Sequence, residues 1–219
     1  MIAYRSNILM VRTLKHLLVT TALCCLLAAC EEKNDNNSNK VTVNPPAGIP
    51  HKESAITNGV DKSPMDMAFY PDNYPILKMQ HKDVEPLRAR LIYSRPQRNG
   101  RVIFGSLVQY GKAWRLGANE ATEIEFFTDV MIDGQKVPRG RYVMYCVPYP
   151  EKWIIKLNSD LNTWGLQIDS TKDLFSFEIP ISKTNYPYEY FTMQFEAADP
   201  GMELSMMWDS VKAVLPIRY

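Results

Sequence analysis

Residues 122–158 read TEIEFFTDVMIDGQKVPRGRYVMYCVPYPEKWIIKLN and contain the clearest structural signal in this chain. At the start of this stretch, the apolar residues Ile124 and Phe126 alternate with the glutamates Glu123 and Glu125. This alternation has the period of two that is typical of a strand with one buried face. The stretch therefore begins with a predicted half-buried strand.

Two turn signals divide the rest of this stretch. Asp133-Gly134 predicts a tight turn between two antiparallel strands, because both residues tolerate the backbone angles that such a turn requires. Pro148–Glu151 predicts a second turn, since its two prolines interrupt a sheet ladder. The predicted hairpins pair 130–132 with 135–137 and 141–147 with 152–158.

The same pattern continues on both sides of this stretch. Residues 87–93 alternate, and four later segments are apolar and bounded by turn residues. These later segments are 174–181, 188–196, 204–208 and 211–217. Turn signals recur about every ten residues, which is typical of all-β sandwiches and barrels. We therefore expect residues 64–219 to form one all-β domain, a single antiparallel β-sandwich of immunoglobulin-like or jelly-roll type.

The N-terminal segment 1–29 predicts export. Arg12 and Lys15 precede an apolar run of 14 residues, which is too short to span a bilayer but suits the core of a signal peptide. The run ends Leu27-Ala28-Ala29-Cys30, which resembles the lipobox of bacterial lipoproteins. This resemblance implies lipid attachment at Cys30 through acyl chains of the palmitate type, and hence a membrane as partner. The alternative is an ordinary signal peptide with an unrelated cysteine.

Residues 30–63 predict a disordered tether behind the lipidated cysteine. Asn, Ser, Lys, Pro and Gly dominate this segment and aromatic residues are absent, so it cannot bury enough apolar area to offset its ordering entropy. A flexible segment of this length spans roughly 30 Å. Glu31 and Glu32 resemble export signals of some Gram-negative surface lipoproteins. We therefore expect a lipid-anchored protein in the cell envelope, in the outer membrane, on its periplasmic or surface face.

Charge and cysteine content narrow the possible functions. Removal of the three basic residues before Cys30 leaves 22 basic and 24 acidic residues, a net charge of −2. This balance excludes the basic stripe of a typical nucleic-acid-binding protein. Cys146 is the only thiol left after processing and lipidation, so no intrachain disulfide is expected. Its place in an alternating strand predicts a core residue rather than a nucleophile.

The segment WRLGANE, residues 114–120, is the strongest candidate for a binding loop. Trp114 offers a large apolar face and Arg115 a planar fork of donors. Asn119 and Glu120 add an amide and a carboxylate. One interpretation is a polar pocket for a glycan or a peptide. The other is a structural cross-link in which Arg115 binds Glu120 and backbone carbonyl groups, because buried charges need such partners in any case.

Three further residues are weaker candidates for ligand binding. Arg95 lies next to a proline after a predicted strand and is either a pocket residue or a solvent-facing arginine. Trp164 is either a platform for a sugar ring or a core aromatic. Asn158 follows a strand, where an asparagine is more often a turn residue than a ligand group.

Few residues indicate catalysis. Only two histidines follow Cys30, His51 and His81, which disfavours a histidine metal site or a Ser-His-Asp triad. No catalytic residue, metal or cofactor is predicted. The enzymatic alternative is a carboxylate-dependent hydrolase that pairs Glu120 with another acid, for which Glu123, Glu125 and Asp160 are candidates.

Several motifs in the domain resemble one known family. They include YSRP at 93–96, GRVIFGSLV at 100–108 and YGKAWRLGANEAT at 110–122. A P-x-G-x-Y turn at 138–142 and a W-x-x-x-x-N-x-D-x-x-x-W-G run at 153–165 extend the resemblance. The chain is similar to domain-of-unknown-function family 2911, a family of exported bacterial proteins, over about 77–217. This resemblance implies a β-rich envelope domain and brings no activity.

These observations leave three functions open. The first is a tethered domain that binds a glycan or a peptide in the cell envelope through the WRLGANE loop. The second is the carboxylate-dependent hydrolase. The third is a scaffold or assembly subunit, which predicts a contiguous exposed apolar patch.

Overall fold

The computed structural model describes residues 62–80 and 83–219. The predicted signal peptide, Cys30, the tether up to residue 61 and both histidines His51 and His81 lie outside the described residues. None of the described helices is long and apolar enough to cross a membrane.

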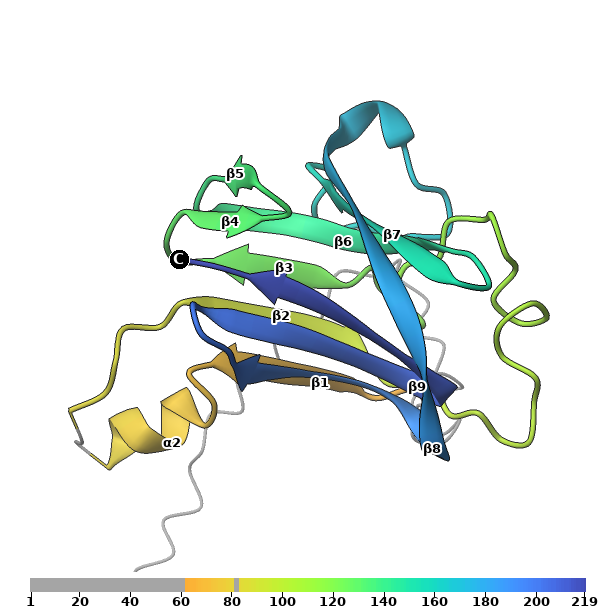
Figure 1. The fold of residues 1–219 in the computed structure, drawn as a ribbon, viewed down its shortest axis with the longest axis horizontal. Helices are drawn as coiled ribbons and strands as arrows, with labels where there is room; N and C mark the ends of the chain where they lie inside the picture. The colour runs from red at the N-terminus through yellow and green to blue at the C-terminus, as the bar shows by residue number, and fades with distance from the viewer. Residues whose placement is uncertain (1–61, 81–82) are drawn as a thin grey trace, which may run out of the picture. The chain divides into compact units, whose positions relative to one another are not determined.

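Nine strands form the body of the domain (Figure 1). Seven of them form one antiparallel sheet in the order β1-β2-β3-β6-β7-β8-β9, and β4 and β5 form a separate hairpin. The strands are β1 (Met65–Tyr70), β2 (Ala89–Ser94), β3 (Glu123–Phe126), β4 (Val130–Ile132), β5 (Gln135–Val137), β6 (Gly140–Pro148), β7 (Lys152–Asn158), β8 (Asp173–Ala197) and β9 (Met202–Ile217). A helix α2 (Tyr74–Met79) and a 3-10 turn η2 (Ser170–Lys172) complete the elements.

The alternation of residues explains the first half of the sheet. Leu91 pairs with Ile124, which in turn pairs with Tyr142 on β6, and all three side chains are buried. Their neighbours along the strands point to the other face, since successive side chains alternate across a strand. Glu123 and Glu125 lie on that other face and form ion pairs there. Both predicted hairpins are confirmed as β4–β5 and β6–β7.

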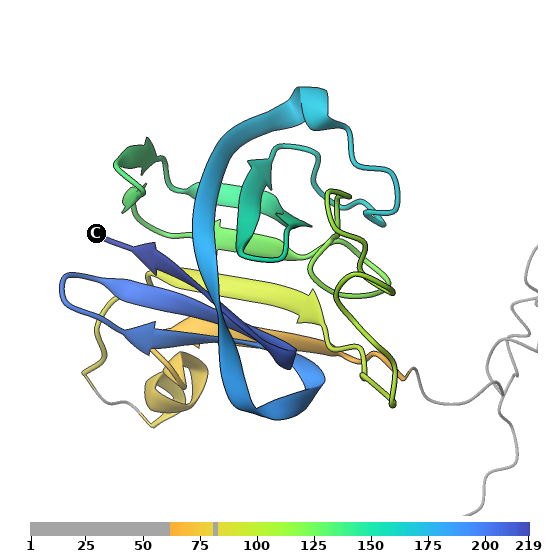
Figure 2. The same ribbon diagram turned by 45° about the vertical axis from the view of Figure 1, so that its right-hand side comes forward.

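Strand β8 changes partner about a third of the way along its length. The residues up to Pro180 pair with β7, and from Ile181 onward the strand pairs with β9. Figure 2 shows the strand crossing the domain as one long ribbon, so that the sheet curls back over itself. The prediction of separate strands at 174–181 and 188–196 is therefore wrong. The same holds for 204–208 and 211–217, which lie in the one strand β9. The strand continues through an irregularity of the β8–β9 pairing, where Asp209 has a left-handed φ angle of +50°.

Backbone contacts also join the start of the sheet to the second half of β8. Gln97, just after β2, forms an antiparallel bridge with Tyr190, and the Phe191 amide donates to the Pro96 carbonyl at 3.0 Å. The curled sheet encloses a core in which the largest fully buried side chains are aromatic. These side chains are Trp153, Trp208, Tyr93, Phe126, Phe177 and Phe191.

The prediction of an all-β domain with antiparallel strands is confirmed. The finer expectation of a sandwich of immunoglobulin-like or jelly-roll type stays a prediction. Three elements were not predicted: β1, the 3-10 turn η2, and the helix α2, whose six residues are too few for a helical period. Cys146 is a free, buried core residue, as predicted, and burial raises the pKa of its thiol well above the ordinary value.

Candidate functional site: a cavity under the β2–β3 loop

The long loop between β2 and β3, residues 95–122, is fixed to the sheet by backbone and side-chain bonds. Trp114 and Cys146 exchange two backbone hydrogen bonds, of 2.7 and 2.8 Å, which fix the middle of the loop to β6. Trp114 Nε1 donates to the Gly117 carbonyl at 3.2 Å. The buried Thr122 hydroxyl donates to the Leu116 carbonyl at 2.6 Å. The loop is therefore an ordered part of the domain, although it contains no regular element.

A cavity of about 410 Å³ opens under this loop, and we call it the motif cavity. It is lined by Ser63, Pro96, Arg101, Leu107, Val108, Ala113, Trp114, Arg115, Gly117, Ala118, Gly165, Leu166 and Trp208. Most of these residues lie in the four motif segments 93–96, 100–108, 110–122 and 153–165. Segments that are far apart in the sequence therefore meet around one concave site.

Aromatic side chains form the inner wall of the motif cavity. Trp114 stacks on Trp208, with ring centroids 5.8 Å apart and ring planes at 21°. Phe191 packs against both rings. Trp208 is almost fully buried, and its Nε1 has no hydrogen-bond partner among the described residues. Trp208 therefore belongs to the core, and the partly buried Trp114 packs against it, so that neither ring is an exposed platform.

Among the described residues that line the motif cavity, the two charged side chains are both arginines. Arg101 Nε donates to the Arg98 carbonyl at 3.0 Å and its Nη2 to the Gln97 carbonyl. Arg115 Nη1 donates to the Trp164 carbonyl at 3.0 Å. Burial lowers the pKa of the Arg115 guanidinium, and the charge of Glu120 opposes this shift. Arg101 Nη1 and Arg115 Nη2 bind no acceptor in the described part of the chain, so both remain available to an anion.

The other residues of the predicted loop site lie elsewhere. Glu120 and Trp164 line a second cavity of about 430 Å³, together with Met65, Ile92, Ala121, Glu123, Asn162 and Thr163. Asn119 donates to the Ser63 carbonyl at 3.4 Å. Arg115 stacks over the Trp164 ring, with its Cζ 5.9 Å from the ring centroid, and so lies between the two cavities. The described residues include no salt bridge between Arg115 and Glu120. Of the structural cross-link predicted for Arg115, the structure contains only the hydrogen bond to the Trp164 carbonyl.

Arg95 joins β1 to the second half of β8. Its Nη1 forms an ion pair with Asp66 at 3.0 Å, and its Nη2 donates to the Thr192 hydroxyl at 3.0 Å. Its Nε donates to the Phe191 carbonyl at 3.3 Å. With all three nitrogens bound, Arg95 has a structural role and does not line the motif cavity.

Asn158 is part of a buried polar network at the end of β7. Its amide nitrogen donates to the Asp169 carbonyl at 2.9 Å and to Asp173 Oδ1 at 2.8 Å. Tyr145 donates to the same carboxylate at 2.8 Å, and Lys156 forms an ion pair with it at 3.0 Å. Burial, together with the Asp173 carboxylate, raises the pKa of the Tyr145 hydroxyl. The network fixes the loop after β7, and it leaves Asn158 no contact with either cavity.

One charged residue and one large aromatic residue of the motif cavity are among those that the sequence did not indicate. Arg101 lies in the segment that resembles the family, but an arginine between a glycine and a valine gives no sign of a binding role. Trp208 lies on β9, almost a hundred residues from Trp114. Only the curled sheet brings it under the loop, so no local pattern could have indicated it.

A family model described as "Protein of unknown function (DUF2911)" matches residues 77–217, which is more than half of the chain. The chain belongs to the DUF2911 family. The match runs from α2 to the end of β9 and so covers the curled sheet except β1. No curated protein and no solved structure matches the chain. The motif cavity of this DUF2911 protein therefore has to be interpreted from its own geometry.

Proposed function

We propose that this DUF2911 protein is a lipid-anchored envelope protein that binds a carboxylate-bearing ligand in the motif cavity. The observation that supports the proposal is the convergence of four separated motif segments on one cavity, whose described lining residues include two arginines and no acid. An arginine guanidinium binds a carboxylate through parallel charge-assisted hydrogen bonds, which favours Arg101 and Arg115 as anion-binding groups.

The apolar rim of the motif cavity indicates that the ligand carries an apolar group beside its carboxylate. Leu107 and Leu166 line it and are 48% and 74% exposed. Such aliphatic side chains lose unfavourable contact with water when an apolar group covers them. A peptide with a free C-terminal carboxylate and an aliphatic last residue supplies both parts. A sugar acid would lack the aliphatic part, and Trp208 of the inner wall is too buried to stack on a ring.

The proposal includes the location and the architecture of the protein. A signal peptide at 1–29, a lipid on Cys30 and a tether over 30–63 would hold the domain near the outer membrane. The body would then be a sandwich-like domain in which the curled half of the sheet, β8 and β9, packs over the other half. The tether would let the cavity reach ligands in the surrounding envelope.

Binding of short peptides to the full-length protein tests the cavity. We expect a peptide ending in a free leucine carboxylate to bind, and we expect R115Q and R101Q each to weaken binding by about tenfold, because each removes a charged hydrogen-bond donor. R139Q is the matched control, since Arg139 is exposed and lies outside the cavity. Calorimetry gives the affinities.

Two results would contradict this proposal. One is equal affinity for the peptide and for its C-terminal amide, because the amide has no carboxylate for the arginines. The other is normal binding by the R101Q/R115Q double variant. Preference for a uronic acid oligosaccharide over the peptide would keep the anion site and exclude the peptide.

One observation favours the hydrolase as a second candidate. Glu120 and Glu123 line the same second cavity, as a pair of catalytic carboxyl groups would. However, Glu123 forms an ion pair with Arg141 at 3.3 Å and accepts from the backbone N–H of Asn162 at 2.9 Å, so both contacts are structural. If the chain hydrolyses envelope glycans, E120Q should abolish the activity while leaving peptide binding in the motif cavity unchanged.

A further inference from the structure

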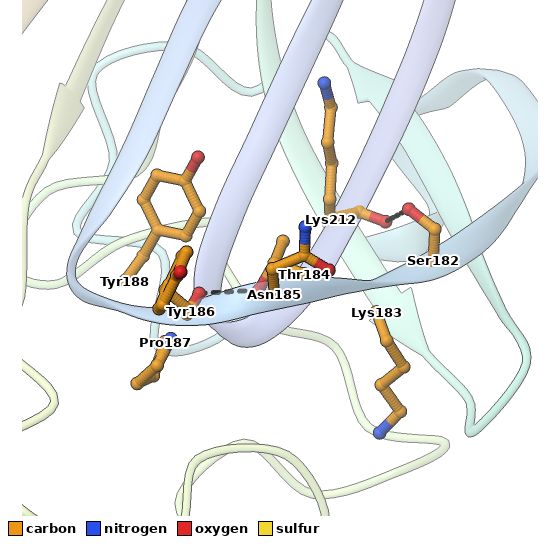
Figure 3. Close-up of a pocket in the computed structure, with 8 residues that line it drawn as sticks. All are labelled: Ser182, Lys183, Thr184, Asn185, Tyr186, Pro187, Tyr188 and Lys212. Atoms are coloured by element: carbon orange, nitrogen blue, oxygen red, sulfur yellow. Dashed lines mark hydrogen bonds between the residues drawn. The ribbon is translucent and has the colours of Figure 1, made fainter.

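A second concave site lies on β8, where the strand loses its regular register. The pairing of β8 with β9 shifts between Lys183 and Tyr188 and again before Thr192. The irregular stretch borders a cleft of about 440 Å³. We call it the tyrosine–lysine cleft, and it is lined by Ser182, Lys183, Thr184, Asn185, Tyr186, Pro187, Tyr188 and Lys212 (Figure 3).

Hydrogen bonds within the cleft maintain its shape. The Thr184 hydroxyl donates to the Tyr186 carbonyl at 2.8 Å, which stabilises the bend of the strand. The Ser182 hydroxyl donates to the Lys212 carbonyl at 3.4 Å and joins β8 to β9 at the end of the cleft. Figure 3 shows both bonds as dashed lines, on either side of Asn185. The cleft is therefore built from hydrogen-bonded strand residues rather than from a loose loop.

Two tyrosines present their rings beside this cleft. Tyr186 is 81% exposed and Tyr188 39% exposed, and Figure 3 shows them next to each other. Large aromatic side chains are costly to leave in water, and exposed ones often mark binding surfaces. A tyrosine ring can cover the apolar face of a sugar while its hydroxyl stays hydrated.

The charge of the cleft is positive. Its two charged lining residues, Lys183 and Lys212, form no ion pair with any described residue. The nearest carboxylates along the strands are already bound: Asp209 forms an ion pair with Arg98 at 3.0 Å. Glu189 accepts a hydrogen bond from the backbone N–H of Asn99 at 2.8 Å. Figure 3 shows Lys212 extending from the same side of the ribbon as Tyr188, and Lys183 extending from the opposite side.

We propose that the tyrosine–lysine cleft binds an acidic oligosaccharide, with sugar rings on Tyr186 and Tyr188 and a carboxylate at Lys212. The combination of adjacent exposed aromatic rings with an unpaired cation fits a chain of sugar acids, which has apolar ring faces and a regular negative charge. This site shares no residue with the motif cavity and does not depend on the function proposed for that cavity.

Binding of hexagalacturonate to the full-length protein, with neutral maltohexaose for comparison, tests this site. Hexagalacturonate should bind more tightly than maltohexaose, and its affinity should fall as sodium chloride rises from about 50 to 300 mM, because salt screens exposed charges. Y186A should weaken binding by about tenfold through loss of ring contact. K212Q should weaken binding by about fivefold and remove most of the preference for the acidic sugar.

Matched variants separate the cleft from general surface effects. Y149A removes a tyrosine of similar exposure to Tyr188, and K78Q removes an exposed lysine on α2, so both should bind normally. An excess of the leucine-terminated peptide should leave hexagalacturonate binding unchanged, which keeps this test independent of the motif cavity. Unchanged binding by Y186A and K212Q, or equal affinity for the two oligosaccharides, would overturn the proposal. Loss of binding to anionic phospholipid vesicles alone in these variants would show a membrane contact instead and would also overturn it.

Discussion

Gly165 illustrates how a single residue shapes the motif cavity. Its φ angle is +75°, in the left-handed region that glycine adopts at little cost. A Cβ atom at this position would lie 2.9 Å from the Ala121 Cβ and 3.0 Å from the Arg115 Cβ. Glycine therefore allows the loop after β7 to pack directly against the chain that presents Arg115.

The G165A variant tests this close approach. We expect it to lower the free energy of unfolding by about 2–3 kcal/mol, because the added methyl group is both strained and crowded. Urea unfolding measures the loss, and peptide binding in the motif cavity should weaken with it. G134A is the control, since Gly134 has a φ angle of +72° and a Cβ added there would meet nothing within 4 Å. It should lose only about 1 kcal/mol, and equal losses would show that crowding at Gly165 is unimportant.

The sequence indicated some residues of the site and not others, for reasons that lie in local geometry. Trp114 and Arg115 line the motif cavity, as the residue types in WRLGANE suggested. Asn119 and Glu120 are only a few residues further on, but left-handed backbone angles at Leu116 and Asn119 redirect the chain. Glu120 therefore lines the other cavity. Residue types predict which groups can bind, whereas the path of an irregular loop decides which of them meet.

Among the elements, β1 and β8 are joined by the packing of Tyr70 against Phe195 and by the hydrogen bonds of one arginine side chain. Arg95 binds Asp66 on β1 and both Phe191 and Thr192 on β8. We expect R95A to lower the free energy of unfolding by about 1–2 kcal/mol, because three hydrogen bonds are lost at a site that is partly screened by solvent. Amide hydrogen exchange should accelerate in 65–70, since the strand loses its bond to the curled half of the sheet.

R90A is the matched control for this prediction. Arg90 forms an ion pair with Glu125, and its side chain is 35% exposed, close to the 33% of Arg95. Its partner lies on β3, which already pairs with β2 along its whole length. Exchange in 65–70 should therefore stay near that of the original protein in R90A. Faster exchange throughout the sheet in both variants would contradict a specific link through Arg95.

The long strands show where prediction of elements from the sequence fails. The hairpins β4–β5 and β6–β7 were predicted because Asp133-Gly134 and the prolines near 148–150 mark turns directly. In β8, the polar residues at 182–187 look like a turn, yet the chain stays extended and only shifts its register. The change of partner from β7 to β9 depends on contacts between distant segments. Alternation alone therefore predicts strands, and it does not predict where one strand ends when a sheet curls.

For the whole molecule, the curled sheet places both proposed ligand sites around the end of the β2 strand. Pro96 lines the motif cavity, and the next residue, Gln97, bridges Tyr190 just beyond the tyrosine–lysine cleft. The two sites therefore belong to one domain in which backbone bonds connect their borders. Peptides and acidic glycans are both exposed in a bacterial envelope. Either site can therefore bind its proposed ligand only if the domain is delivered to the envelope.

Lipid attachment at Cys30 is the prediction on which this delivery depends. If the cysteine is acylated and becomes the first residue, the mature protein should exceed the mass of residues 30–219 by the mass of its acyl groups and should fractionate with membranes. C30S should lose the added mass and the membrane association, because acyl chains supply about 0.8 kcal/mol per buried methylene and serine cannot receive the thioether-linked lipid. C25S, in the predicted leader, is the matched control and should be processed normally. A mature N-terminus at another residue, or a C30S variant that still fractionates with membranes, would show that the domain is held in the envelope by other means.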